Sequence, residues 1–149
     1  MEIERYFEQI VDPTIADLEA NPTSVRHAFL AAVVVFHAID YLDANSYRKQ
    51  FREDNADFAL VDRIAHAFKH VRTRDPQIPA LSAEEVIERP SALYGEAKSI
   101  LDMSFWDWAD LGGVTLNSDR QLDVLSAIKR ATEFMRRQIG RKQDAAEKT

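Results

Sequence analysis

The chain contains no cysteine among its 149 residues. This absence excludes disulfide bonds, thiolate ligands for metals and a cysteine nucleophile, and it is compatible with a reducing cytosol. Glycine and proline are also scarce, with four and five residues. A β-sandwich needs many turns that are rich in these two residues, whereas long helices do not. The composition therefore predicts an all-α protein.

Long apolar runs are missing as well. The longest covers residues 28–36, about half the length of a membrane-spanning helix, and charged residues flank it. The chain opens with MEIERYFEQI, which is acidic and amphipathic, so we expect no signal peptide. These features predict a cytoplasmic protein without a membrane partner.

Blocks of basic residues are absent too. The 19 basic and 25 acidic residues are interspersed and give a net charge of −6. We therefore expect no broad DNA-binding surface, although the composition allows a local basic cleft. The sequence also lacks a glycine-rich phosphate loop, a GxSxG nucleophile elbow and an HExxH zinc motif.

What the sequence does contain is helical periodicity. Apolar residues recur at intervals of three and four in four stretches: residues 3–20 with a kink at Asp12-Pro13, residues 25–44, residues 55–72, and a last helix that begins near residues 117–119. Asn55 is a suitable N-cap for the third helix, and the polar residues 117–119 offer caps for the fourth.

The pattern weakens between residues 73 and 116. Residues 82–85 have the form of a capping box for a short helix, and Gly112-Gly113 precedes a short extended segment. We predict one all-α domain over residues 1–140, followed by a polar, frayed tail over residues 141–149. Its fold is an up-and-down bundle of about four main helices, with short accessory helices between the third and the fourth.

All four histidines lie in the second and third predicted helices, and three of them fall in two short stretches, residues 36–42 and 63–70. His37 stands in an apolar run, three residues before Asp40. In the third helix, a rotation of about 100° per residue places the titratable side chains of the middle in one sector. These residues are Asp62, Arg63, His66, Lys69 and His70. Antiparallel packing of the two helices would bring both groups together.

Three kinds of protein use such a cluster. A metal protein would take its ligands from both helices, at His37, Asp40, His66 and His70. A nuclease without a metal would use an arginine to stabilise charge on a phosphate and a histidine to move the proton of a ribose hydroxyl. An interaction module would use the cluster only to set how the helices pair, and it needs no chemistry.

Plainer structural interpretations stand beside these. Asp62, Arg63 and Lys69, taken singly, fit the solvated face of an amphipathic helix. His37 fits a buried histidine held by one hydrogen bond. Trp106 and Trp108 fit a hydrophobic flap over one end of the bundle, with ligand stacking as the alternative. Together with Tyr94 they also predict a symmetric homodimer.

Two features carry a resemblance to known proteins. Arg63 and His70 lie on one helix with six residues between them. A four-helix bundle with such a pair resembles the HEPN superfamily. Residues 25–72 also resemble a group of small uncharacterised bacterial proteins, which have a histidine three residues before an acidic residue, here His37 and Asp40. In these proteins an alanine-rich segment that ends in Lys-His follows, here residues 65–70.

The resemblance implies a bacterial ribonuclease of a defence or toxin-antitoxin system that cuts RNA as a dimer, without metal or cofactor. His70 would be the general base or acid, His66 its partner, Arg63 the residue that binds the scissile phosphate, and Lys69 the contact to a neighbouring phosphate. His37 and Asp40 would orient the pocket from the adjacent helix. Many members of the superfamily have lost catalysis and serve as binding partners, so the interaction module stays open.

Overall fold

The computed structural model describes residues 2–41, 47–70, 81–90 and 112–146, with side chains except at positions 69, 70 and 142–146. Most of these residues are helical. The elements, in chain order, are α1 (Ile3–Tyr6), the π-helical turn η1 (Phe7–Val11), α2 (Asp12–Ala20), α3 (Val25–Tyr41), α4 (Arg48–Asp54), α5 (Ala56–His70), the 3-10 turn η3 (Ala83–Glu85), β1 (Val86–Arg89), β2 (Gly113–Leu116) and α7 (Val124–Ala146).

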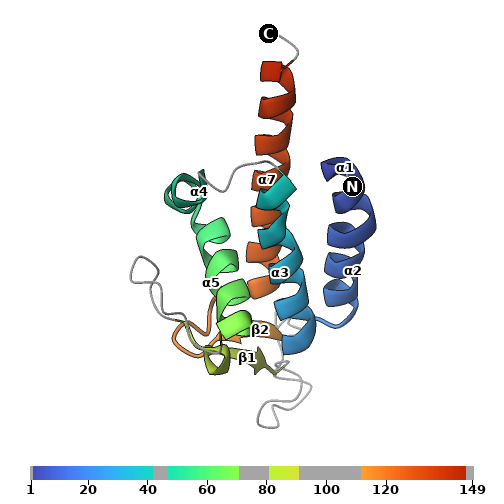
Figure 1. Cartoon of the computed structure of the whole chain (residues 1–149). Coiled ribbons are helices and arrows are strands. Elements are labelled where there is room, and N and C mark those ends of the chain that lie inside the picture. Colours follow the sequence, from blue (N-terminus) through green and yellow to red (C-terminus); the bar gives the residue numbers. More distant parts are fainter. Residues whose placement is uncertain (1, 42–46, 71–80, 91–111, 147–149) are drawn as a thin grey trace, which may run out of the picture.

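The main helices form an up-and-down bundle (Figure 1). The continuous helix α1–η1–α2 descends in this view, α3 rises, α5 descends and α7 rises. Helix α3 therefore packs antiparallel to α5, although the connection between them contains the short helix α4. The predicted mostly helical bundle of four main helices is confirmed, and α4 is an additional short helix between the second and the third.

Apolar side chains from all main helices meet in one core. Its largest fully buried members include Phe7, Leu18, Ile39, Phe58 and Ile128. Three phenylalanines join α4, α5 and α7 through ring contacts: Phe51, Phe58 and Phe134, with centroid distances from 5.4 to 6.1 Å. Burial of such a side chain stabilises the fold by about 1.5–3 kcal/mol, so the apolar faces hold the bundle together.

Pro13 does not end the first helix. It has no N–H and cannot bond the carbonyl of Gln9 as an α-helix requires. The turn just before it is π-helical, and the Asp12 N–H donates to the Phe7 carbonyl five residues earlier. The Thr14 hydroxyl donates to the Ile10 carbonyl at 2.6 Å. The helix thus takes up the proline by widening one turn.

The two predicted helix caps have different outcomes. Asn55 caps α5, since the Phe58 N–H donates to Asn55 Oδ1 at 2.7 Å. For the fourth helix the prediction was wrong, because residues 117–119 belong to the turn that follows β2. The cap of α7 is Asp123, whose Oδ2 accepts the Ser126 N–H at 3.1 Å. A chain that leaves a strand needs several residues to reverse before a helix can begin.

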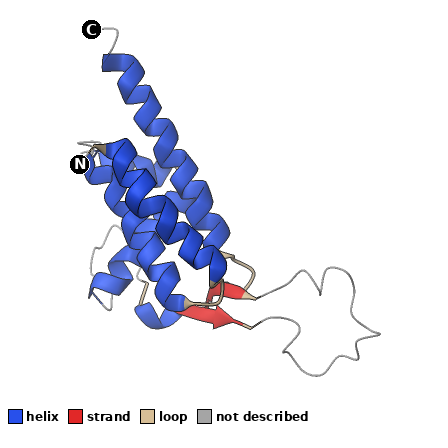
Figure 2. Ribbon diagram, turned by 90° about the vertical axis from the view of Figure 1, so that its right-hand side faces the viewer, coloured by secondary structure: helices blue, strands red, loops and turns tan. Residues whose placement is uncertain are grey.

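A small antiparallel sheet closes the lower end of the bundle (Figure 2). Val86 of β1 pairs with Leu116 of β2, and Arg89 pairs with Gly113. Gly112 has a φ of 78°, which favours glycine, and it leads into the extended segment that the sequence predicted. The short helix expected at residues 82–85 is the single 3-10 turn η3, and strand β1 was not predicted.

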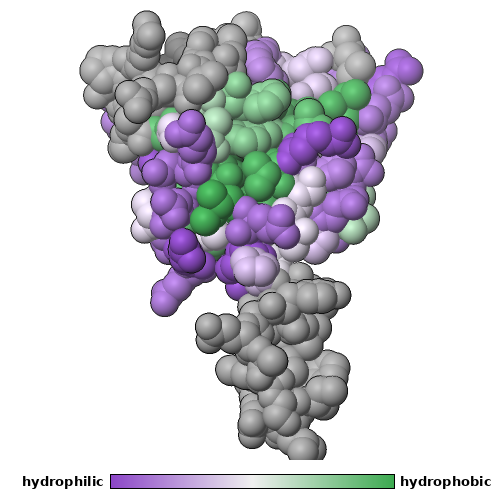
Figure 3. Space-filling model, turned by 90° about the horizontal axis from the view of Figure 1, so that it is seen from below, coloured by the Kyte–Doolittle hydropathy of each residue, from purple (hydrophilic) through white to green (hydrophobic). Residues whose placement is uncertain are grey.

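Apolar side chains also gather on the surface of this lower end (Figure 3). Helix α5 ends there, and its Phe68 is 53% exposed although its ring rests on Phe29 of α3, with centroids 5.1 Å apart. Tyr94, Trp106 and Trp108 lie outside the described residues. At the other end, α7 extends to Ala146, five residues beyond Arg141, where the predicted polar tail begins. No proline follows Arg141, and residues 141–146 are mostly good helix formers.

Candidate functional site

Helix α4 packs against part of the polar sector of α5, at Asp62 and His66. Arg48 of α4 donates two hydrogen bonds to Asp62 of α5, from Nη2 to Oδ1 at 2.6 Å and from Nε to Oδ2 at 3.2 Å. Arg52, one turn later, donates from Nη1 to Asp62 Oδ2 at 3.2 Å. The Asp62 side chain is 0% exposed. The solvated-face interpretation is therefore wrong for Asp62, because α4 packs over it.

His66 completes this arrangement. Its Nδ1 lies 2.8 Å from the Asp62 backbone carbonyl and 2.8 Å from Asp62 Oδ1. Its Nε2 lies 2.8 Å from Arg48 Nη2. A guanidinium group only donates, and Arg48 Nη2 also lies 3.2 Å from Nδ1, so the shorter of the two contacts assigns Nε2 as the acceptor and leaves Nδ1 to donate to Asp62. We call Arg48, Arg52, Asp62 and His66 the α4–α5 cluster.

The cluster has more positive than negative charge. Two guanidinium groups face one carboxylate, and a buried carboxylate without cations would cost several kcal/mol. The cationic side chains keep some contact with solvent: Arg48 is 27% exposed and Arg52 15% exposed. The guanidinium carbon of Arg48 also lies 4.8 Å above the Phe36 ring, a cation–π contact. The outer side of the cluster can therefore accept an anion.

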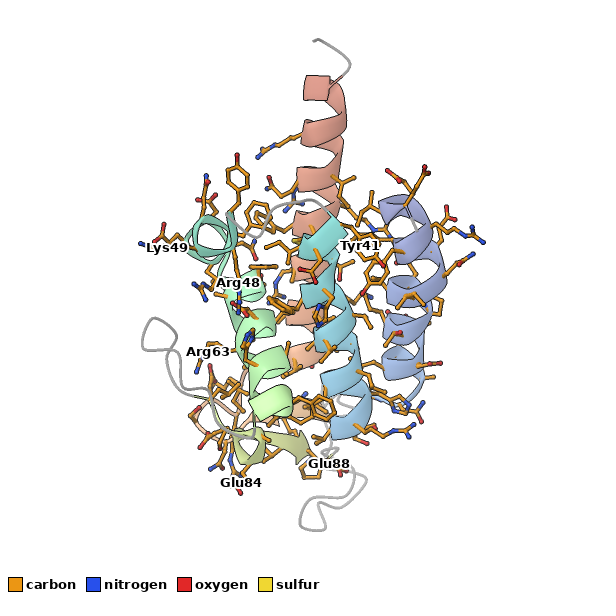
Figure 4. The ribbon with its side chains drawn as sticks, in the orientation of Figure 1. Tyr41, Arg48, Lys49, Arg63, Glu84 and Glu88 are labelled. Carbon is orange, nitrogen blue, oxygen red and sulfur yellow. The ribbon has the colours of Figure 1, made fainter. Side chains whose placement is uncertain are left out.

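The predicted catalytic residues lie along α5. Arg63 of α5 is half-buried. In Figure 4 it lies on the same side of the bundle as Arg48 of α4, and below it. The backbone of α5 continues to residue 70 and places positions 63, 66 and 70 on one side of the helix over two turns. The side chains of Lys69 and His70 lie outside the description. Of the predicted catalytic residues, His66 belongs to the α4–α5 cluster.

The His37–Asp40 pair on α3 is hydrogen-bonded but exposed. His37 Nδ1 lies 2.8 Å from Asp40 Oδ2, and each side chain is 48% exposed. The buried-histidine interpretation of His37 is wrong, since this face of α3 is open to solvent. Phe36 contacts both His37 and His66 of the α4–α5 cluster: its ring centroid is 5.3 Å from that of His37 and 5.2 Å from that of His66. His37 of α3 and His66 of α5 are thus connected by the ring of Phe36.

An open pocket of about 380 Å³ adjoins this pair. Tyr6, His37, Asp40 and Tyr41 line it. The ring of Tyr6 stacks on that of Tyr41 at a centroid distance of 4.4 Å, and its hydroxyl donates to the Val34 carbonyl at 2.8 Å. Burial, followed by the negative charges that Tyr41 and Asp40 can carry, raises the pKa of Tyr6 to about 12. The Tyr6 phenol is therefore a fixed, neutral wall of the pocket.

The metal alternative gains no complete ligand set from the described side chains. Among them, no three histidine, aspartate or glutamate groups gather closely enough to hold a metal ion. His66 Nε2 faces the Arg48 guanidinium, which a divalent cation would repel. His70, the fourth predicted ligand, has a side chain outside the description, so this alternative would depend on it.

Sequence reasoning missed Arg48 and Arg52. A signal was present, because the two arginines are four residues apart and flank Phe51, which gives one basic and one apolar helix face. Tyr6 was missed for a different reason: its partner Tyr41 is far away in the sequence, and only packing brings them together.

The described helices were also compared with membrane-spanning helices, and the chain was compared with known proteins. Within the described residues, every helix is too short or too polar to cross a membrane. Comparisons with protein-family models, with curated proteins and with solved structures find no match to this chain. The resemblance to the HEPN superfamily therefore stays a prediction, and it depends on the residues of α3 and α5.

Proposed function

We propose that the chain is a HEPN-like, metal-independent ribonuclease whose substrate phosphate binds beside the α4–α5 cluster. One observation carries the proposal: two arginines and a histidine gather around a single buried carboxylate, on the side of α5 that also carries Arg63. The excess positive charge favours a phosphate, and a guanidinium group matches its oxygens with two parallel hydrogen bonds.

The chemistry would be transfer of the phosphodiester to the neighbouring ribose hydroxyl. A base takes the proton of the 2′-hydroxyl, whose oxygen attacks phosphorus, and an acid protonates the departing 5′ oxygen. The products are a 2′,3′-cyclic phosphate and a free 5′-hydroxyl. In the proposed assignment Arg63 binds the scissile phosphate, His70 is the base or acid with His66 as its partner, and Lys69 holds a neighbouring phosphate.

The geometry of His66 suggests how substrate would activate the site. Its Nε2 accepts a hydrogen bond from Arg48, so it has no free lone pair for a ribose proton. A phosphate that draws the Arg48 guanidinium away would release Nε2, while Asp62 keeps hold of Nδ1. Substrate binding and the activation of the base would then be one event.

A non-catalytic interaction module is the second candidate. The complete burial of Asp62 between two arginines favours it, because such a contact also serves to fix α4 on α5. In that case the cluster holds the helices together and needs no substrate.

Cleavage of single-stranded RNA in EDTA distinguishes the candidates. We expect the parent chain to leave 2′,3′-cyclic phosphate ends, and His70→Ala to lose about 10²–10⁴-fold in rate. Arg63→Lys should also cut slowly although its charge is kept, since an ammonium group cannot present a planar fork. His27→Ala, which changes a histidine at the start of α3, is the matched control and should cleave like the parent.

Two results would reject the ribonuclease. Equal rates for His70→Ala and the parent, at matched purity and folding, would show that the activity comes from elsewhere. A parent chain that turns over no RNA under any condition would leave the interaction module. Self-association and a role in bacterial defence or toxin-antitoxin systems belong to the same proposal, because the resemblance implies both.

A further inference from the structure

We propose that the pocket lined by Tyr6, His37, Asp40 and Tyr41 binds a guanine base of single-stranded RNA and so selects where the strand is cut. This inference rests on the proposed function, because it assigns a base subsite to the same substrate. It concerns a different part of the molecule from the α4–α5 cluster, and the two can be tested separately.

The position of the pocket links it to the phosphate site. The Arg48 guanidinium lies 4.8 Å from the Phe36 ring centroid, and the His37 ring centroid lies 5.3 Å from the same point. Phe36 therefore separates the basic cluster from the pocket by the width of one aromatic side chain. Neighbouring nucleotides of a single strand can reach both, with a phosphate at the arginines and a base in the pocket.

Tyr41 provides the stacking surface. One face of its ring is covered by Tyr6 at 4.4 Å, with an angle of 25° between the planes, yet the side chain is 40% exposed. Tyr6 cannot turn away easily, because its hydroxyl is bonded to the Val34 carbonyl. A base that stacks on the exposed part of Tyr41 would extend an aromatic pile that is already built, which is how single-stranded RNA is commonly held.

Asp40 selects among the bases. A carboxylate only accepts hydrogen bonds, and guanine is the base that offers two adjacent donors, N1–H and N2–H, on its Watson–Crick edge. Adenine and cytosine present one amino group there, and uracil one imide N–H. Asp40 is 48% exposed at the mouth of the pocket, so its oxygens can be reached.

His37 holds the carboxylate in place. Its Nδ1 is bonded to Asp40 Oδ2, one turn along α3, and both residues belong to one rigid helix. The pair restricts rotation of the carboxylate before a base arrives. His37 is thus a positioning residue in this inference. The pocket volume of about 380 Å³ is close to the lower end of the range of small-molecule sites, about 300–1,000 Å³.

The direct test is calorimetric titration of the parent chain with guanosine 5′-monophosphate and with the adenosine, cytidine and uridine monophosphates. We expect the guanine nucleotide to bind at least about tenfold more tightly than the others, since hydrogen bonds to a charged group differ by that much. Equal binding of all four nucleotides, or no binding of the guanine nucleotide at millimolar concentration, overturns the inference.

Variants then locate the binding site. Asp40→Asn should weaken the guanine nucleotide about tenfold or more and remove the preference, because an amide offers both a donor and an acceptor. Asp17→Asn removes an exposed carboxylate of α2 and is the matched control, which should bind like the parent. Tyr41→Ala should weaken binding about 5- to 100-fold, whereas Tyr41→Phe keeps the ring and should retain it. Circular dichroism of each variant confirms folding.

The outcomes separate this inference from the proposed function. RNA cleavage that depends on His70 but shows no preference for guanine, with no effect of Asp40→Asn, rejects the base pocket and keeps the ribonuclease. Selective guanine binding that Asp40→Asn abolishes, in a chain that cuts no RNA, supports the pocket and rejects the ribonuclease. Guanine binding that is unchanged in Asp40→Asn and in Tyr41→Ala places the nucleotide elsewhere and overturns the inference.

Discussion

Asp62 is the residue on which the contact between α4 and α5 depends. It is completely buried and accepts hydrogen bonds from Arg48 and Arg52. Its removal would leave two guanidinium groups beside an apolar core with no carboxylate to neutralise them. The free-energy cost of such an uncompensated charge exceeds the stabilisation that the intact ion pair provides, because water cannot fully replace the lost partner.

Asp62→Ala should therefore lower the free energy of unfolding by about 2–4 kcal/mol, measured by urea denaturation at neutral pH. Asp57→Ala is the matched control. Asp57 lies on the same helix and is held by the two nitrogens of Arg130 at 2.8 and 2.9 Å, but this pair is at the surface. We expect a loss below about 1 kcal/mol there. Equal losses in both variants would contradict the structural role of Asp62.

Tyr6 makes the stability depend on alkaline pH. Its pKa is raised to about 12 in the folded chain, against 10 for an ordinary tyrosine, so folded Tyr6 holds its proton more tightly than unfolded Tyr6. The stabilisation by the neutral phenol is complete below pH 10 and is lost as the pH rises from 10 to 12. The loss occurs because unfolded chains ionise first.

Between pH 9 and pH 11, Tyr6→Phe should therefore lose about 1 kcal/mol less unfolding free energy than the parent, measured by urea titration at both values. The variant also lacks the bond to the Val34 carbonyl, which lowers its stability at every pH and leaves this difference intact. Tyr47→Phe, which removes an exposed phenol, should behave like the parent. Parallel pH dependence of Tyr6→Phe and the parent would exclude the buried phenol as the cause.

At the scale of elements, short helices in this chain depend on their ends and neighbours. A seven-residue helix such as α4 is unstable in water by itself, so Asp62 and the ring of Phe58 supply what its own hydrogen bonds cannot. Helix α5 begins directly after α4, and Asn55 satisfies an N–H group that would otherwise lack a partner.

Asn55→Ala should cost about 1 kcal/mol of unfolding free energy, because the Phe58 N–H loses its acceptor. Asn55→Ser supplies another side-chain acceptor at the same position and should recover most of the loss. Thermal denaturation followed by circular dichroism would measure both. A serine variant as unstable as the alanine variant would show that Asn55 acts by other means than capping.

The end of α7 offers a second test of elements. The helix projects beyond the other helices at its C-terminal end, as Figures 1 and 2 show. Among the described side chains of α7, Ile139 is the last one in the buried core. Deletion of residues 141–149 should change the unfolding free energy by less than about 1 kcal/mol, whereas deletion of residues 134–149, which removes Phe134 and Met135 as well, should cost several kcal/mol. Equal effects of both deletions would show that the projecting turns are not dispensable.

At the scale of the whole molecule, self-association stays a prediction, which the resemblance to the HEPN superfamily implies. Phe68 and Leu30 are exposed apolar side chains, with exposed fractions of 53% and 40%, and a second copy could bury them. We expect multi-angle light scattering to give the mass of a dimer at micromolar concentration. Phe68→Glu should shift the mass towards the monomer, and Glu8→Gln, an exposed change on η1, should not. A monomer at all usable concentrations would contradict the dimer.

Helices, the α5 cap and the short extended segment near Gly113 could be predicted from the sequence, because each depends on residues a few positions apart. Apolar spacing of three and four, a polar residue before a helix and a pair of glycines act through the local backbone. The polar sector of α5 and the pair His37–Asp40 were recognised for the same reason: each repeats with the turn of a helix.

Burial and partnership were decided by the tertiary structure alone. Whether Asp62 faces water depends on Arg48 of α4, which lies 14 residues earlier in the sequence. The pocket depends on Tyr6, which packs against the end of α3 and whose hydroxyl donates to the Val34 carbonyl, 28 residues later. His37 looked buried because its neighbours in sequence are apolar, yet its side chain is 48% exposed. A helical pattern states which residues share a face, and only the packing of other elements shows what meets that face.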